Sequence, residues 1–216
     1  MYMKKVFGIL VAILICSTMA MCIGQIDVPE SFKQDYQKIE STQKEIETLY
    51  LAYESQVDKR IEYVEKNKST SDSNISNIDY KYLLSLLESE TLILDELDQK
   101  SATYSSEIND LFTKTKDIKN NEVKSKANEL IIILRNSQQY LTNGIVRLKS
   151  ATNSTGSAIY YYASGANLND PLVVKEIQDL NLDAKTGFDE AVLALNNYYT
   201  LTKDANATYQ ELLKTK

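Results

Sequence analysis

The side chains that usually carry catalysis are scarce in this sequence. It contains no histidine, which removes the usual general base and the commonest transition-metal ligand. Carboxylates do gather in two places, at Glu88 with Glu90 and at Asp95, Glu96 and Asp98. Their spacing matches no calcium loop with its required glycine, so we interpret them as a solvated helix face. The sequence therefore predicts a protein that is not an enzyme and that needs no cofactor or metal.

The N-terminus has the layout of an export signal. Lys4 and Lys5 precede an uncharged apolar run, residues 6–15, and small and apolar residues follow as far as Cys22. Because a positively charged flank stays in the cytoplasm, the rest of the chain is delivered outside. The stretch 6–23 is at the short limit for a spanning helix, so an uncleaved anchor stays open beside a cleaved signal. Either way, we expect the body at the outer face of the cell membrane.

Cys22 is the candidate site of lipid attachment. The body after it has no cysteine, and a lone cysteine at the exit of an export signal is typical of a lipid anchor. The stretch from Met19 to Cys22 resembles the lipobox of prokaryotic lipoproteins, although Met21 stands where Gly, Ala or Ser is usual. We therefore divide this region into a signal or anchor segment, residues 1–22, and a short tether, residues 23–28.

A further resemblance rests on the same segment and on composition. The short signal that ends in Cys-Ile-Gly-Gln, followed by a body rich in Lys, Asn and Tyr, resembles small surface lipoproteins of methanogenic archaea. It implies a surface location and carries over no functional residue except Cys22.

The charge of the exported body restricts its partners. Without Lys4 and Lys5 the chain has 22 basic and 30 acidic residues, a net charge of −8. No basic patch or arginine-rich helix occurs, which argues against nucleic acid as a partner. We expect contact with the membrane through the N-terminal lipid or helix, and a protein partner at the cell envelope.

Four long segments of the body have the apolar periodicity of helices. Apolar residues recur at steps of three and four, as in a helix with one buried stripe, and Gln43 takes one apolar position of the first stripe. The scarcity of glycine and proline also favours long helices. The predicted helices cover residues 29–66, 78–118, 122–166 and 170–214.

Local signals mark some of the helix ends. Ser76 followed by Asp79 is typical of a capping box, and Asp170 before Pro171 indicates an N-cap with proline at the first helical position. The sequence that ends at Gly156 resembles a turn, yet the apolar register continues beyond it. We predict one third helix through Gly156; a break there would give a long hairpin packed against two shorter helices.

Short connections between long helices force antiparallel neighbours, so the predicted fold is all-α, an elongated up-down-up-down four-helix bundle. Each helix would be roughly 60 Å long. Because the first helix leaves the membrane, the ends near residues 67, 80 and 165 form the distal tip. Six tyrosines collect there, as a candidate patch for sugars, peptides or proteins or as filling for a wide bundle end: Tyr63, Tyr80, Tyr82, Tyr160, Tyr161 and Tyr162.

Four asparagines lie in glycosylation sequons and are candidate glycan sites if the host glycosylates exported proteins: Asn67, Asn74, Asn153 and Asn206. Together, these features predict a membrane-tethered, extracytoplasmic, non-enzymatic bundle that acts as a binding or structural interaction module. The alternative is a ligand-capturing, sensor-like bundle or an accessory subunit of a membrane receptor or transporter.

Overall fold

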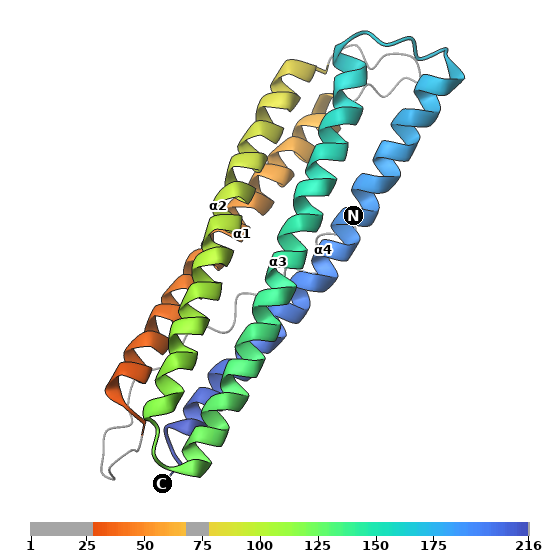
Figure 1. The fold of residues 1–216 in the computed structure, drawn as a ribbon. Helices are drawn as coiled ribbons and strands as arrows, with labels where there is room; N and C mark the ends of the chain where they lie inside the picture. Colours follow the sequence, from red (N-terminus) through yellow and green to blue (C-terminus); the bar gives the residue numbers. More distant parts are fainter. Residues whose placement is uncertain (1–27, 68–77, 216) are drawn as a thin grey trace.

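The computed structural model describes residues 28–67 and 78–215, which form four long antiparallel helices (Figure 1). The helices are α1, Glu30–Asn67; α2, Tyr80–Lys114; α3, Asn121–Ala163; and α4, Pro171–Leu212, with a short 3-10 helix, η2, at Thr115–Asp117. The predicted all-α four-helix bundle is therefore confirmed. Cys22, the signal or anchor segment and tether residues 23–27 lie outside the described residues. No described helix has an apolar stretch suited to crossing a membrane.

Side-chain caps fix where three of the helices begin. Asp79 accepts hydrogen bonds from the backbone N–H groups two and three residues further on, at 2.9 and 3.2 Å. Asn120 does the same before α3, and Asp170 caps α4 at 2.9 Å as predicted. Each cap satisfies N–H groups that have no partner inside the helix and stabilises it by about 1 kcal/mol. Asp79 is thus the N-cap itself, which corrects its predicted role as the capping-box partner of Ser76, a residue outside the described ranges.

The ends of α2 and α3 come a few residues earlier than predicted. The last turn of α2 tightens into η2, so the α-helix ends at Lys114 and not at residue 118. α3 ends at Ala163 because Gly165 takes a positive φ of 70°. The N–H groups of Gly165 and Ala166 then donate to carbonyls three and five residues back, at 3.2 and 3.1 Å. This pattern is a Schellman motif, which favours glycine at the left-handed position.

α3 runs without a break through Gly156, as predicted. Each helix turns one apolar stripe toward the common core. The largest fully buried side chains include Tyr36, Tyr104, Tyr198, Phe32, Ile39, Ile46, Leu94, Leu97, Ile108, Leu111, Leu130 and Ile131. Tyrosines thus occupy the centre of the bundle as well as its tip.

α3 and α4 make the most extensive close backbone contact in the described bundle. Small residues allow this approach. A Cβ atom placed on Gly187 of α4 would lie 3.0 Å from the Cβ atom of Ala151 and 3.2 Å from the carbonyl oxygen of Arg147. Gly144 likewise leaves room for Leu195, whose Cγ would lie 2.8 Å from an added Cβ. Gly187 therefore lies within α4 at a place where an added Cβ atom would press against α3.

The backbones of α1 and α4 stay farther apart, and tyrosines bridge them. Tyr36 stacks on Tyr209 with ring centroids 3.7 Å apart, and its hydroxyl donates to Oδ1 of Asn206 at 2.6 Å. Further along, Tyr50 meets Tyr199 edge to face at 6.3 Å. Rings of this size bury much apolar surface and hold two helices at a wide separation. The bundle therefore has one close side and one wide side.

A buried hydrogen-bond chain links three of the helices at mid-height. Gln43 of α1 donates to the Tyr104 hydroxyl of α2 at 3.0 Å, and that hydroxyl lies 2.8 Å from Oγ of Ser137 on α3. Ser137 itself donates to a backbone carbonyl of α3, so the Tyr104 hydroxyl is the donor to Ser137. Gln43 occupies an apolar position of its stripe because a partner inside the core satisfies its amide.

Two glycine-to-alanine substitutions should have opposite effects on stability. Gly156→Ala removes a helix-weakening glycine where the nearest atom, Cδ1 of Leu87, is at an ordinary 3.8 Å, so stability should rise by about 0.5–1 kcal/mol. Gly187→Ala gains the same propensity but forces α3 and α4 apart, and should lower stability by about 1 kcal/mol net. Urea unfolding followed by circular dichroism measures both. Equal shifts in the two variants would contradict the close packing described.

Candidate functional site

Four of the six predicted tip tyrosines form two aromatic pairs between helices. Tyr63 of α1 meets Tyr82 of α2 with ring centroids 4.7 Å apart, and Tyr80 of α2 stacks on Tyr162 of α3 at 5.7 Å. The Tyr63 hydroxyl also accepts a hydrogen bond from the backbone N–H of Asp79 at 2.8 Å. These four side chains join neighbouring helices at the end opposite residue 28.

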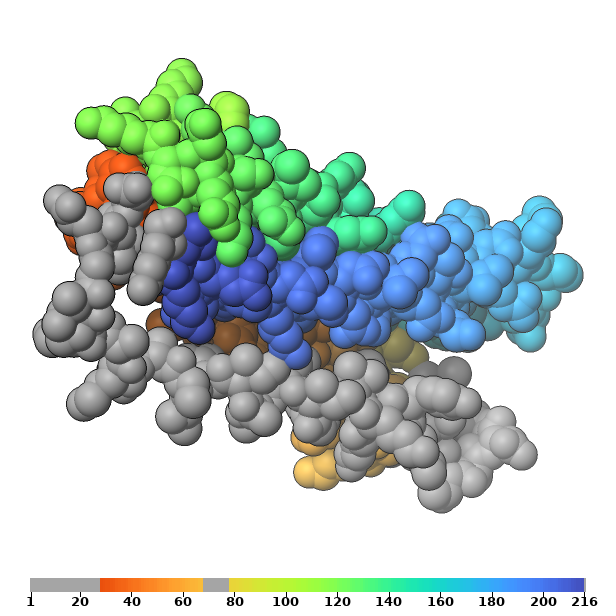
Figure 2. Space-filling model, turned by 90° about the horizontal axis from the view of Figure 1, so that it is seen from below, coloured from red at the N-terminus to blue at the C-terminus, as the bar shows by residue number. Residues whose placement is uncertain are grey.

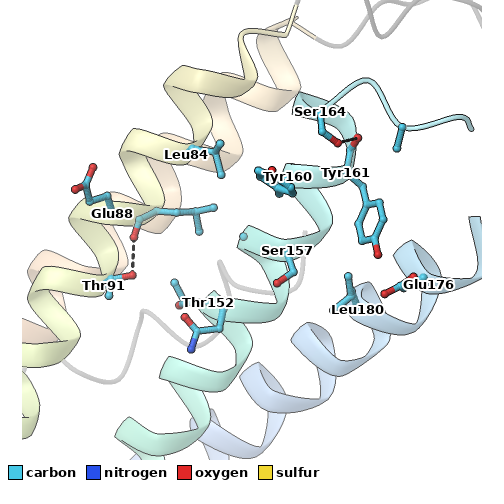
Figure 3. A pocket seen from close by; sticks show the side chains of 14 residues that line it. Leu84, Glu88, Thr91, Thr152, Ser157, Tyr160, Tyr161, Ser164, Glu176 and Leu180 are labelled. Carbon is cyan, nitrogen blue, oxygen red and sulfur yellow. Dashed lines mark hydrogen bonds between the residues drawn. The ribbon is translucent and has the colours of Figure 1, made fainter. Parts of the chain in front are cut away.

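The other two tip tyrosines stand on either side of the outer face of α3. The Tyr160 side chain points toward α2 and is 64 % exposed. It forms none of the aromatic pairs found among the described residues. Tyr161 points toward Glu176 of α4 (Figure 3), and this carboxylate raises the pKa of the Tyr161 hydroxyl. The six tyrosines therefore do not form one continuous patch.

A groove of about 880 Å³ crosses this outer face of α3, and we call it the tip groove. Its lining residues come from α2, α3, the loop after α3, and α4: Leu84, Leu87, Glu88, Thr91, Thr152, Asn153, Gly156, Ser157, Tyr160, Tyr161, Ser164, Ala166, Glu176 and Leu180. Figure 3 shows Ser157 between Tyr160 on the α2 side and Tyr161 on the α4 side. The groove lies at the tip because its walls are the last turns of α3 and the adjoining turns of α2 and α4.

Small residues on α3 create the hollow. Gly156, which faces Leu87 of α2, has no side chain, and the short side chain of Ser157 lies between the two tyrosines. Leucines of α2 and α4 supply apolar walls. Except for its two tyrosines and Asn153, the groove was missed by sequence reasoning. One signal was available, because Gly156 with Ser157 and Ser164 with Gly165 bracket the tyrosine run on an exposed stretch of helix.

The charge of the tip groove is negative. Glu88 and Glu176 contribute carboxylates, and none of the described residues that line the groove is Lys or Arg. A bound anion would meet repulsion here, whereas neutral or cationic groups would not. Within residues 28–67 and 78–215, no cluster of three or more His, Cys, Asp or Glu side chains is arranged to hold a metal ion.

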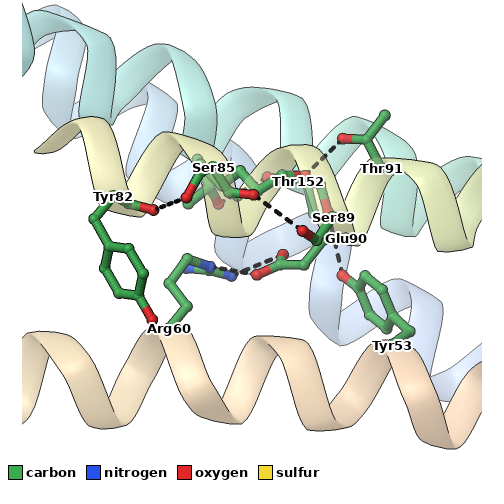
Figure 4. Close-up of polar contacts among 11 residues, drawn as sticks. Tyr53, Arg60, Tyr82, Ser85, Ser89, Glu90, Thr91 and Thr152 are labelled. Atoms are coloured by element: carbon green, nitrogen blue, oxygen red, sulfur yellow. Dashed lines mark hydrogen bonds and ion pairs between the residues drawn. The ribbon is translucent and has the colours of Figure 1, made fainter.

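A buried ion pair lies behind the groove and joins α1 to α2 (Figure 4). Arg60 binds Glu90 with two hydrogen bonds, Nε to Oε1 at 2.7 Å and an Nη to Oε2 at 3.3 Å. Glu90 is completely buried, so its predicted place on a solvated helix face is wrong. Burial raises the pKa of the Glu90 carboxyl, and the guanidinium of Arg60 opposes this rise. Glu88 and the other predicted carboxylates are exposed.

Thr152 connects the groove to this interior. It lines the groove and is itself buried, and its hydroxyl lies 3.1 Å from the hydroxyl of Tyr53 on α1. Figure 4 shows Tyr53 and the Arg60–Glu90 pair side by side beneath α2. The inner wall of the groove is therefore tied to α1 by a polar contact.

Three of the four sequon asparagines lie on helices, and Asn74 lies outside the described residues. Asn67 is the last residue of α1 and not part of the predicted loop, and its Nδ2 donates to the carbonyl of Tyr63 at 2.7 Å. Asn206 accepts the Tyr36 hydrogen bond near the opposite end. Asn153 is exposed in the tip groove.

No family model matches this chain, and no curated protein or solved structure was found to be similar to it. The resemblance of the N-terminal segment to surface lipoproteins of methanogenic archaea stays a prediction.

Replacing Arg60 should destabilise the tip in a pH-dependent way. Arg60→Met leaves the Glu90 carboxylate buried without a partner and should cost about 3 kcal/mol near pH 7. Without the guanidinium that opposes it, burial raises the pKa of Glu90 further, so the folded variant holds its proton to a higher pH than the wild type and loses more stability as the pH rises. The loss should therefore shrink as the pH is lowered toward about 5.

Urea unfolding over a series of pH values measures this effect. The control is Arg60→Met combined with Glu90→Gln. This double variant has no carboxyl at position 90, so the part of the pH dependence that comes from Glu90 should disappear. A loss of equal size at every pH in the single variant would show that Glu90 is not a buried carboxylate.

Proposed function

We propose that this chain is a non-enzymatic protein, tethered by its N-terminus to the outer face of the cell membrane, whose helical bundle presents a binding site away from that membrane. The export-type segment and Cys22 support the tether. The bundle then acts as a rigid spacer, because long antiparallel helices with buried tyrosines and hydrogen bonds hold its length fixed.

The position of the tip groove is the observation that carries this proposal. α1 begins at Glu30, close to the tether, and runs to Asn67 at the other end of the bundle. The groove is lined by residues at that far end, from the start of α2, the end of α3 and the start of α4. A protein held at residue 22 would therefore present the groove toward the surroundings of the cell.

An accessory role beside a membrane receptor or transporter is the second candidate. Leu172, Leu182 and Leu193 on α4 are between 62 % and 75 % exposed. Figure 2 shows α4 lying along the length of one face of the body. These leucines lie ten and eleven residues apart along α4, so a partner that binds the side of the bundle could cover all three.

The anchor can be tested by intact-mass measurement of protein extracted from membranes. We expect a mature chain that begins at Cys22 and carries added lipid mass, because the cysteine thiol is the attachment point. Cys22→Ala should remove that mass, whereas the control Cys16→Ala should keep it. An unmodified chain that starts at Met1 but stays in the membrane would replace the lipid with an uncleaved anchor. Recovery in the cytoplasm would contradict the proposed location.

The binding role of the tip can be tested by photocrosslinking in intact cells. A photoreactive residue in place of Tyr160 should form adducts with a component of the cell envelope, because this side chain stands exposed in the groove. The matched control is the same residue in place of Tyr140, which is also an exposed tyrosine of α3 but lies outside the groove. Equal labelling from the two positions, or none from Tyr160, would contradict the proposal.

A further inference from the structure

We propose that the tip groove binds a neutral oligosaccharide, with the ring of Tyr160 as a stacking platform and the surrounding hydroxyl, amide and carboxylate groups as hydrogen-bonding partners. This inference rests on the proposed binding role of the bundle tip and names the class of ligand that it takes. It is carried by the exposure of Tyr160, the chemistry of the groove lining and the shape of the groove.

Tyr160 differs from the other tyrosines at the tip. Tyr63, Tyr80, Tyr82 and Tyr162 are paired ring to ring, whereas Tyr160 is 64 % exposed and belongs to no such pair in the described bundle. Water-exposed aromatic area is available to be covered by a ligand. The C–H face of a sugar ring suits the flat face of tyrosine, which combines apolar area with a hydroxyl at its edge.

The polar groups along the tip groove match a ligand that carries many hydroxyls. Sugar hydroxyls both donate and accept hydrogen bonds, and so do the hydroxyls of Ser157 and Ser164 and the amide of Asn153. The carboxylate of Glu176 is an acceptor with two oxygens, which suits a pair of neighbouring hydroxyls. Since no Lys or Arg is among the lining residues, phosphorylated or sulfated sugars would meet only negative charge.

The shape of the groove favours an extended ligand. Its volume of about 880 Å³ lies within the usual range of small-molecule sites. The groove crosses α3 between Tyr160 and Tyr161, where the short side chain of Ser157 lies between the two rings. Apolar side chains from two other helices border it, among them Leu84 and Leu180. An oligosaccharide could lie across α3 in the tip groove, with one sugar ring against Tyr160 and further sugar units toward Tyr161.

An organic cation is the competing ligand, because tyrosine and glutamate together can hold an ammonium group. The geometry argues against it. The Glu88 side chain points away from Tyr160, and Glu176 lies on the far side of α3, where it faces Tyr161 (Figure 3). No carboxylate therefore stands beside the Tyr160 ring to complete a cationic site. An exposed ring with hydroxyl and amide groups near it, and no carboxylate beside it, fits a sugar better.

The test uses the purified full chain in detergent and a panel of neutral di- to tetrasaccharides built from hexose and N-acetylhexosamine units. Saturation-transfer NMR identifies binders, and titration gives their dissociation constants. We expect at least one oligosaccharide to bind with a dissociation constant of about 1 mM or lower. Tyr160→Ala should weaken it about tenfold, whereas Tyr160→Phe should stay within about threefold of the wild type, because stacking needs the ring.

Two further variants sharpen the result. Ser157→Leu should abolish binding, because the larger side chain fills the groove between Tyr160 and Tyr161. Tyr140→Ala, outside the groove, should leave the dissociation constant unchanged. Circular dichroism confirms that each variant stays folded. The proposal is wrong if no neutral oligosaccharide binds, or if binding survives Tyr160→Ala. An alkylammonium or basic peptide that binds instead, with the same dependence on Tyr160, would also overturn it.

The photocrosslinking experiment separates this inference from the proposed function. Crosslinks from position 160 without oligosaccharide binding would support the proposed binding role of the tip and contradict only the oligosaccharide as its ligand. Absence of both would overturn the two together.

Discussion

The close contact between α3 and α4 is the constraint on which the shape of the bundle depends. Gly187 and Gly144 each leave space that a Cβ atom would fill, so these two helices approach more closely than the others. Four helices around one core cannot all approach equally when one pair is pulled together. The opposite side of α4 then faces α1 across a wider gap. The same contact explains why a helix-weakening glycine sits in the middle of α4.

Tyrosine fills the wide side of the bundle and sets its register. The Tyr36–Tyr209 stack and the Tyr36–Asn206 hydrogen bond fix α1 against α4 at the end of the bundle where α1 begins. At mid-height Gln43, Tyr104 and Ser137 form a chain in which every buried polar group has a partner. Buried hydrogen bonds of this kind penalise a slipped register, because slipping would leave polar groups unpaired. Tyrosine serves here because it brings bulk and a hydroxyl together.

Contacts between helices also decide which side chains stay exposed at the tip. Toward that end the helices are joined by aromatic pairs and by the buried Arg60–Glu90 ion pair, which need partners on two helices at once. Side chains used in this way are not free to bind a ligand. Tyr160 lies on the outer face of α3, beyond these contacts, and its ring stays exposed in the tip groove. Tyrosines that join helices and a tyrosine that stays exposed are therefore neighbours in sequence.

The amino-acid sequence alone determined the helices, their antiparallel order and the Asp170 cap, because these depend on periodicity and on neighbours within a few residues. Only the tertiary structure decided that Glu90 is buried, because the local sequence places it on a polar helix face. Its partner Arg60 lies 30 residues away on another helix, and only packing brings the two charges together. It also decided which tip tyrosines pair and that Tyr160 remains exposed, since the direction of each ring depends on neighbouring helices that no local pattern encodes.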